Sequence, residues 1–487
     1  MLAPDDTRRR AGVLLHPTSL PGGDLGADAY RFVEFLQHSG ATLWQMLPTG
    51  PTHADGSPYQ CLSVNAGNEL LISLEGLVEQ GWLQSEQLEA KRQLGDCAMR
   101  RACLSDACRC FLATADESQR QAFNAFCESH HHWLHDFALY RALRQIHRLC
   151  SWVDFPAPLR DREPEALAQA AIGLEDSLLR VKFEQYIFFL QWQTLKTFAQ
   201  ERGVLLFGDM PIFVAHDSAE VWAHRKYFLL DDQGQPIVVA GVPPDYFSET
   251  GQRWGNPLYN WQVMADDGYQ WWIERLRIQM ELFDVVRIDH FRGFEAYWEI
   301  PSHEETAING HWVKGPGNAL FEAITEALGS LPLVAEDLGL ITPEVHALRE
   351  RFQLPGMKIL QFAFDGGSGN SYLPHNHEIC SVVYTGTHDN DTSCGWFNGL
   401  SAEQKTRVME YLGCPAEEMP WPLVRAALAS VALWSVIPMQ DILALDSSDR
   451  MNIPGTSEGN WTWRFDWHQL QPDRQAHFAH LVALYGR

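Results

Sequence analysis

Eight short apolar runs without polar alternation constrain the fold of this 487-residue chain more than any other feature. Strands that are buried on both faces have this composition, because neither face needs polar side chains. Stretches with helical periodicity, such as Ala29–His38 and Thr342–Phe352, separate most of the runs. Strands that alternate with helices form parallel sheets, so the pattern predicts an α/β fold, a (β/α)8 barrel. The runs are Gly12–Leu15, Leu43–Leu47, Val204–Phe207, Asp284–Ile288, Leu333–Ala335, Lys358–Phe362, Ser381–Tyr384 and Ser435–Met439.

The spacing of the runs is uneven, and the chain is longer than the ~250 residues of a plain barrel. We expect one catalytic barrel over residues 1–487 with two insertions. A mainly helical insertion is expected over residues 60–200, after the second strand, where Ser177–Arg202 has apolar periodicity. A loop-rich insertion, rich in Pro, Gly and aromatic residues, is expected over residues 215–267, after the third strand, as a cover for the active site. Only residues 440–487 follow the eighth run, too few for a sizeable all-β C-terminal domain.

The charge of the chain limits its partners. Its formal net charge is −25, and a phosphate backbone would be repelled, so we expect neither a nucleic-acid nor an anionic-membrane partner. No apolar signal-peptide region follows the charged residues 1–10, and the apolar stretch Ala426–Met439 is too short to span a bilayer. These observations predict a cytoplasmic protein.

Ten scattered cysteines in such a protein are expected to be reduced thiols. A zinc site is an alternative where several of them gather, but the spacing is not that of paired C-x-x-C motifs, and ordinary buried thiols and surface histidines are favoured. We therefore expect no metal and no cofactor. The gathered residues are Cys97, Cys103, Cys108, Cys110, Cys127, His131 and His135.

Acidic residues follow three of the predicted strands, at Asp289, Glu336 and Asp389. Barrel enzymes place their chemistry at the carboxyl ends of the strands. Arg287 shares a strand face with Asp289, and a guanidinium favours the ionised carboxylate that a nucleophile needs. The apolar strand before Glu336 predicts burial and a raised pKa, as an acid catalyst needs.

Two such carboxylates fit retaining glycoside chemistry, in which one is the nucleophile and the other the acid/base. The third could hold sugar hydroxyls. Any one acidic residue at a strand end is more often a helix cap or a partner of arginine. Three of them on barrel-like spacing favour an enzyme that works through carboxylates.

The segments around the three acids resemble those of a known family. Arg287–Gly293, Val334–Gly339 and Thr385–Thr392 are similar, in order and separation, to the nucleophile, acid/base and third-carboxylate segments of the amylomaltases, glycoside hydrolase family 77. The resemblance covers most of the chain. Further matching segments are Gly12–Gly22, Gly208–Val214, Val242–Ser248, Gly251–Pro257, Asn452–Thr456 and Gly459–Trp461.

The resemblance implies a 4-α-glucanotransferase, a transferase that moves a segment of a 1,4-α-D-glucan to the 4-hydroxyl of a glucose or maltodextrin acceptor. It implies a double displacement through a covalent glucosyl-enzyme, with Asp289 as nucleophile, Glu336 as acid/base and Asp389 as holder of sugar hydroxyls. Maltooligosaccharides and glucose are the implied partners. The implied substrate-binding residues are Tyr59, Asp209, Arg287, His290, His388, Trp254, Asn256, Tyr246 and Asn460.

The sequence departs from the family at two positions and leaves two alternatives open. Asn65 and Glu69 stand where the family has an aromatic residue and a proline, so details of the acceptor-side surface are not carried over. An α-glucan hydrolase would share the three carboxylates. A catalytically silent glucan-binding protein would keep the fold, but it would gain nothing from a costly cluster of like charges.

Overall fold

Eight parallel strands form the barrel that the apolar runs predict. The computed structural model describes residues 8–91, 96–244, 248–414, 416–456 and 458–487. Neighbouring strands follow the order β10-β11-β12-β1-β2-β3-β6-β9. The N–H of Ala335 donates to the carbonyl of Pro355 (2.9 Å), which joins the two ends of this order. The (β/α)8 prediction is confirmed. The strands are β1 (Arg10–Leu14), β2 (Leu43–Gln45), β3 (Leu205–Pro211), β6 (Val285–Asp289), β9 (Leu333–Ala335), β10 (Gly356–Ile359), β11 (Ser381–Tyr384) and β12 (Trp434–Pro438).

Strand β3 illustrates why predicted and observed strand ends differ by a few residues. The run predicted over Val204–Phe207 continues to Pro211, although strands usually avoid aspartate and proline. Asp209 is tolerated because it is buried and bonded to Arg287 of the adjacent strand β6. A partner on another strand is invisible to a local pattern.

Apolar side chains fill the inside of the barrel. Every strand contributes at least one buried residue to this cluster, so the barrel is a packed core and only the rim is free for chemistry. A second, larger cluster lies between the strands and the surrounding helices. The inner cluster includes Leu14, Leu43, Phe207, Val285, Val334, Ile359, Tyr384 and Val436.

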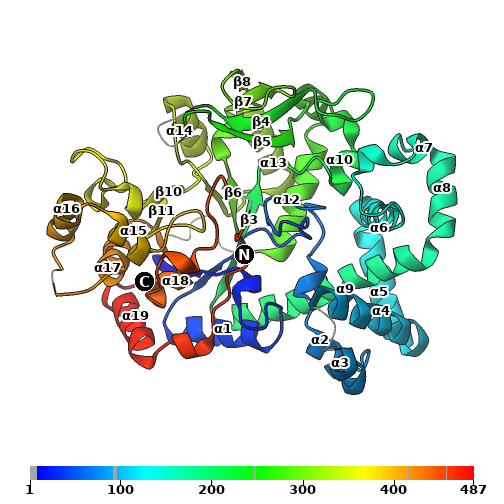
Figure 1. The fold of residues 1–487 in the computed structure, drawn as a ribbon, viewed down its shortest axis with the longest axis horizontal. Coiled ribbons are helices and arrows are strands. Elements are labelled where there is room, and N and C mark those ends of the chain that lie inside the picture. The colour runs from blue at the N-terminus through cyan, green and yellow to red at the C-terminus, as the bar shows by residue number, and fades with distance from the viewer. Residues whose placement is uncertain (1–7, 92–95, 245–247, 415, 457) are drawn as a thin grey trace.

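Helices surround the strands (Figure 1). The helical stretches expected from periodicity all form, and their ends agree with the expected ones to within two residues. The helices that follow the strands include α1 (Ala27–His38), α12 (Gln270–Leu282), α13 (Asn318–Leu328), α14 (Pro343–Arg351), α16 (Ala402–Leu412), α17 (Trp421–Ala429) and α19 (Pro472–Leu484).

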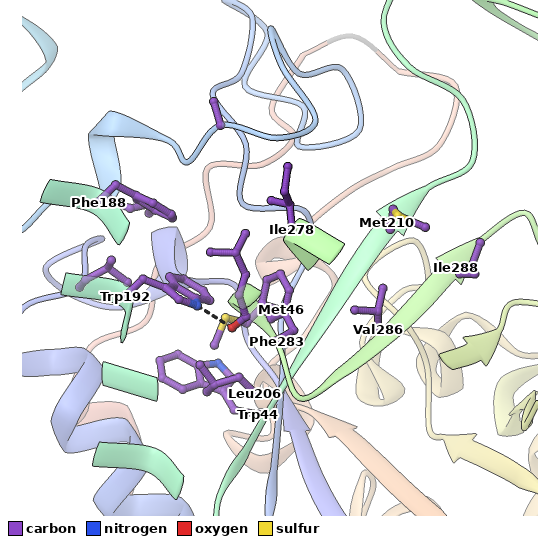
Figure 2. Close-up of a cluster of buried hydrophobic side chains, with 14 of the residues drawn as sticks. Trp44, Met46, Phe188, Trp192, Leu206, Met210, Ile278, Phe283, Val286 and Ile288 are labelled. Atoms are coloured by element: carbon purple, nitrogen blue, oxygen red, sulfur yellow. Dashed lines mark hydrogen bonds between the residues drawn. The ribbon is translucent and has the colours of Figure 1, made fainter. Parts of the chain in front are cut away.

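The chain between β2 and β3 forms a group of helices at one side of the barrel (Figure 1). Its last helix, α9, packs on the barrel through Trp192, whose indole N–H donates to the carbonyl of Leu282 (2.7 Å). Trp192 also contacts Phe188 and Phe283, as Figure 2 shows. The helices are α2 (Leu74–Glu79), α3 (Ser85–Lys91), α4 (Asp96–Thr114), α5 (Glu117–Ser129), α6 (His131–Ile146), α7 (Ala157–Arg160), α8 (Pro164–Gly173) and α9 (Glu175–Glu201).

A four-stranded antiparallel sheet lies beyond the barrel, at the top of Figure 1, and the sequence did not predict it. Its order is β5-β4-β7-β8. Strands β4 (Val238–Val242) and β5 (Gln252–Pro257) come from the segment expected to be loops, and they pair with β7 (Ala296–Pro301) and β8 (His311–Lys314). Glycines and prolines hide these short strands, and the pairing of β4 with β7 joins segments far apart in sequence.

After β12, the described residues form helices and connecting segments without a further strand, ending in α19. No helix in the described ranges is long and apolar enough to cross a membrane.

Candidate active site

Arg287 is the centre of an ionic cluster at the rim of the barrel. Its register places it beside Asp209, because β6 pairs with β3. One guanidinium nitrogen of Arg287 donates to Oδ2 of Asp209 (2.6 Å), and the other donates to Oδ1 of Asp289 (2.8 Å). Burial opposes the charge of Arg287, but the two carboxylates raise its pKa well above the usual value. Arg287 therefore fixes two of the predicted site residues in place.

Glu336 lies directly after β9 and is held by backbone groups. Its Oε2 accepts from the N–H of His290 (2.6 Å), and its Oε1 accepts from the N–H of Leu338 (2.9 Å). Since His290 follows Asp289 in the chain, these bonds place the two predicted catalytic carboxyls side by side. Burial, followed by the charge of Asp289, raises the pKa of Glu336 to about 7, against the opposing effect of Arg287. Glu336 can therefore hold a proton near neutral pH.

Asp389 is fixed from two directions. Its Oδ2 lies 3.3 Å from Nε2 of His388, and its Oδ1 accepts from the side-chain amide of Asn452 (2.6 Å). Arg450 donates to its backbone carbonyl (3.0 Å). Although burial acts in the opposite direction, the charge of His388 and the side-chain hydrogen bonds from His388 and Asn452 hold the pKa of Asp389 at about 2. Asp389 is thus a permanent hydrogen-bond acceptor.

Aromatic rings line the site between these carboxylates. The ring of Tyr59 stacks on His388 at 5.2 Å, and Trp461 lies 6.0 Å from both. The hydroxyl of Tyr59 donates to Oδ2 of Asp209 (2.7 Å). Burial lowers the pKa of His388, but Asp389 outweighs this effect and raises it. The pair of His388 and Asp389 is therefore ionic.

Two polar atoms in the cluster are buried without a hydrogen-bond partner among the described residues. They are Oδ1 of Asp209 and Nε2 of His290. Burial lowers the pKa of His290 to about 4, so its ring is neutral at pH 7. Unsatisfied buried polar atoms are costly, and at a functional site they indicate bonds that a ligand completes.

The remaining predicted binding residues lie on the surrounding loops and strands. The ring of Trp254, on β5, meets His290 in a T-shaped contact at 4.8 Å. The side chain of Asn256 is buried and donates to the carbonyl of Val214 (2.9 Å). Both ends of the Asn460 side chain bond within its own loop, to Ile453 and Thr456. We expected the side-chain amides of Asn256 and Asn460 to face the sugar, but in the structure these amides form hydrogen bonds that support loops. Tyr246 lies outside the described residues.

The two departures from the family sequence are buried. The carboxylate of Glu69 accepts from Arg141 of α6 (2.5 Å). Burial raises the pKa of Glu69, but Arg141 lowers it by more, so that the pKa lies below its usual value and the pair is ionic. The side chain of Asn65 is buried as well. Glu69 therefore ties the loop after β2 to the helices.

Asn452, Arg450 and Trp461 were not identified individually from the sequence as site residues. Asn452 and Trp461 belong to segments that resemble the family, but no local pattern links them to Asp389 or His388. They come from the chain after β12, more than sixty positions from Asp389. That segment contacts the site only because the barrel closes.

The cysteine-rich stretch forms no metal centre in the part of the chain that is described. No group of three or more His, Cys, Asp or Glu side chains there is arranged to hold a metal ion. The ten cysteines are free thiols, and Cys103 and Cys108 are buried in α4.

The family model described as 4-alpha-glucanotransferase, glycoside hydrolase family 77, matches residues 14–470. The chain belongs to this family. Membership makes it a transferase with 4-alpha-glucanotransferase activity, as the sequence predicted.

Relatives of this glycoside hydrolase family 77 member match over nearly their whole length. A 4-alpha-glucanotransferase from Thermus thermophilus is 50% identical, with 98% of each chain covered. One from Synechocystis is 46% identical, with 99% of this chain and 98% of the relative covered.

Two solved amylomaltase structures have the same fold as this chain. The amylomaltase from Streptococcus agalactiae, solved in complex with acarbose, superposes with a TM-score of 0.95 at 36% identity, covering 99% of this chain and 100% of the other. The amylomaltase from Corynebacterium glutamicum, at 17% identity and a TM-score of 0.78, shows the fold alone.

Proposed function

We propose that this family 77 member transfers segments of α-1,4-glucans by double displacement, with Asp289 as nucleophile and Glu336 as acid/base. The observation that carries the proposal is the unequal environment of two adjacent carboxyls. Asp289 forms an ion pair with Arg287, whereas burial raises the pKa of Glu336 to about 7. A retaining mechanism needs one carboxylate and one carboxylic acid in this arrangement.

In the first step, a carboxylate oxygen of Asp289 attacks the anomeric carbon of the glucan. The glycosidic C–O bond breaks, and the proton of Glu336 passes to the leaving oxygen. In the second step, Glu336 takes the proton of the acceptor's 4-hydroxyl, whose oxygen attacks the anomeric carbon. The bond to Asp289 then breaks, and both carboxyls return to their starting states.

The other residues of the cluster hold the sugar that carries the reacting carbon. Arg287 orients Asp289, while Asp389 and His388 bind hydroxyl groups. The unpaired Oδ1 of Asp209 and Nε2 of His290 support the same role, because sugar hydroxyls supply both donors and acceptors. Tyr59 completes this group by bonding Asp209.

We propose maltooligosaccharides as donors and maltooligosaccharides or glucose as acceptors. The Streptococcus agalactiae relative was solved in complex with acarbose, which supports a saccharide ligand for this chain. A cytoplasmic place of action is part of the same proposal. The free thiols of the ten cysteines support it, since reducing compartments preserve thiols, and cell fractionation tests it.

Trp254 is proposed to favour transfer over hydrolysis, and Tyr246, Asn256 and Asn460 stay proposed members of the substrate-binding region. The indole of Trp254 covers His290 and would exclude water from the covalent intermediate. Trp254→Ala should lower the ratio of transfer to hydrolysis. An unchanged ratio would show that the ring only packs locally.

Chromatography of the products from maltotriose tests the proposed function. Oligomers longer than maltotriose demonstrate transfer, whereas glucose and maltose as the sole products demonstrate hydrolysis. A silent binding protein would leave maltotriose intact. Asp289→Ala is the matched control, and transfer above about a hundredth of wild type would rule out its role as nucleophile.

A further inference from the structure

An exposed tryptophan stands on the edge strand of the antiparallel sheet. Trp312 lies on β8, which ends the order β5-β4-β7-β8 (Figure 1). Of the described residues, it is the one tryptophan among the large apolar side chains that remain exposed, at 36%. Exposing so much aromatic surface is unfavourable, and such surface often marks a binding site.

The ring of Trp312 is held rigidly by its neighbours. The guanidinium of the buried Arg292 lies over it, with Cζ 3.8 Å from the ring centroid. Trp298 on β7 meets it in a T-shaped contact at 5.2 Å. Since Arg292 covers one face, the exposed surface is on the other face and its edge. A ring fixed in this way loses little conformational freedom when a ligand binds.

Arg292 connects this ring to the segment that carries Glu336. Its guanidinium donates to the carbonyl of Leu340, and the N–H of Leu338 in the same segment donates to Glu336. Leu340 is itself 68% exposed. Trp312 and Leu340 therefore offer apolar surface on the side of the site where Glu336 lies.

That side is the one occupied by the leaving group and the acceptor, because Glu336 exchanges its proton with their oxygens. The nearby basic side chains lie beside carboxylates. Lys314 pairs with Glu295, and His311 lies 3.6 Å from Glu299. A neutral ligand with apolar C–H faces suits such a surface better than an ion does.

We propose that Trp312 is a binding platform for the acceptor-side part of long α-1,4-glucans, several glucose units away from the bond that reacts. This inference rests on the proposed function. The C–H faces of successive glucose units stack on the exposed face of the ring, as apolar sugar faces do on aromatic side chains. On this proposal, a chain as short as maltotriose occupies only the reacting positions and does not gain the contact with Trp312. The platform thereby sets a preference for long chains.

The test is the ratio of kcat/KM for amylose to kcat/KM for maltotriose, each followed as substrate consumption. Trp312→Ala should lower this ratio about two- to tenfold, the range expected for the loss of one aromatic stacking contact. Trp312→Phe keeps a ring and should lose less. Tyr411→Ala is the control, because Tyr411 is 38% exposed on α16 and lies outside the proposed site.

A ratio equal to that of wild type in Trp312→Ala would overturn the platform. A parallel fall of both kcat/KM values would also overturn it, because the ring would then act only by holding Arg292 and residues 336–340. The products that the wild-type enzyme forms from maltotriose are analysed in a separate experiment. If they contain no oligomer longer than maltotriose, the proposed transfer is refuted. An unchanged kcat/KM ratio in Trp312→Ala refutes the platform alone.

Discussion

Single residues at the rim of the barrel differ in protonation because their neighbours differ. Glu336 has a pKa of about 7 through burial and the charge of Asp289, whereas the pKa of Asp389 is held at about 2 by His388 and Asn452. Two side-chain carboxyl groups, those of Glu336 and Asp389, thus serve as a proton donor and as a permanent anion. Neither value follows from the residue type, so both depend on the folded site.

The pH dependence of kcat/KM should have a basic limb with a midpoint near pH 7. Glu336 must be protonated in the free enzyme, and its raised pKa means that the active form is present below this pH and lost above it. Asp389 stays ionised throughout, since its pKa is about 2. Initial rates with maltotriose between pH 5 and 9 measure the limb. A constant kcat/KM across this range would contradict the assigned acid.

The same raised pKa predicts that Glu336 destabilises the fold at high pH. A carboxyl whose folded pKa is raised gives stability that is present below its unfolded pKa and lost as the pH rises through the folded value. Glu336→Gln should therefore gain stability over wild type between pH 5 and 8, by up to about 3 kcal/mol at about 1.4 kcal/mol per pKa unit. Urea unfolding at both pH values measures the gain. The exposed Glu326→Gln is the control, and an equal gain there would contradict the prediction.

Individual elements owe their positions to contacts with distant parts of the chain. Helix α9 is predicted by its apolar periodicity, but its docking depends on Trp192, which reaches Leu282 and Phe283 at the end of α12. Strand β4 pairs with β5 on one side and with the distant β7 on the other. Local periodicity therefore predicts a helix or a strand better than it predicts where that element packs.

Trp192→Ala should destabilise the protein by about 3–5 kcal/mol, the usual cost of removing a buried aromatic side chain. The indole is fully buried and its N–H is bonded to Leu282. Trp192→Phe keeps the contacts with Phe188 and Phe283 and should cost less. The midpoint of urea unfolding measures both variants. A midpoint equal to that of wild type in Trp192→Ala would show that α9 is docked by other contacts.

At the scale of the whole molecule, a partly buried polar network connects the helices between β2 and β3 to the loop after β3. Asp217 in that loop accepts from Tyr140 of α6 (2.9 Å), from the backbone N–H of Trp152 (3.2 Å) and from Arg144. The barrel and the helices are therefore coupled by charge as well as by apolar packing.

Asp217→Ala should cost about 3–5 kcal/mol of stability, because it leaves the largely buried cation of Arg144 without its partner. Asp217→Asn retains an acceptor for Tyr140 and should cost less. Thermal unfolding followed by circular dichroism compares the two. Equal unfolding temperatures for wild type and Asp217→Ala would mean that the network contributes nothing to the junction.

The sequence by itself determined the barrel and its three acids. Apolar runs can be recognised in the sequence because a strand buried on both faces lacks polar alternation. Asp289 and Glu336 follow such runs directly, and Asp389 follows one after a short connecting segment. The family resemblance then divided the expected roles among them. These features depend on residues that are close together in the chain.

Only the tertiary structure decided how those acids are surrounded. The bridge from Arg287 to Asp209, the support of Asp389 by Asn452, and the second sheet all join segments that are distant in sequence. The raised pKa of Glu336 likewise comes from burial and from a neighbouring charge. A local pattern cannot encode such contacts, because hydrogen bonds and electrostatic interactions depend on distance in space.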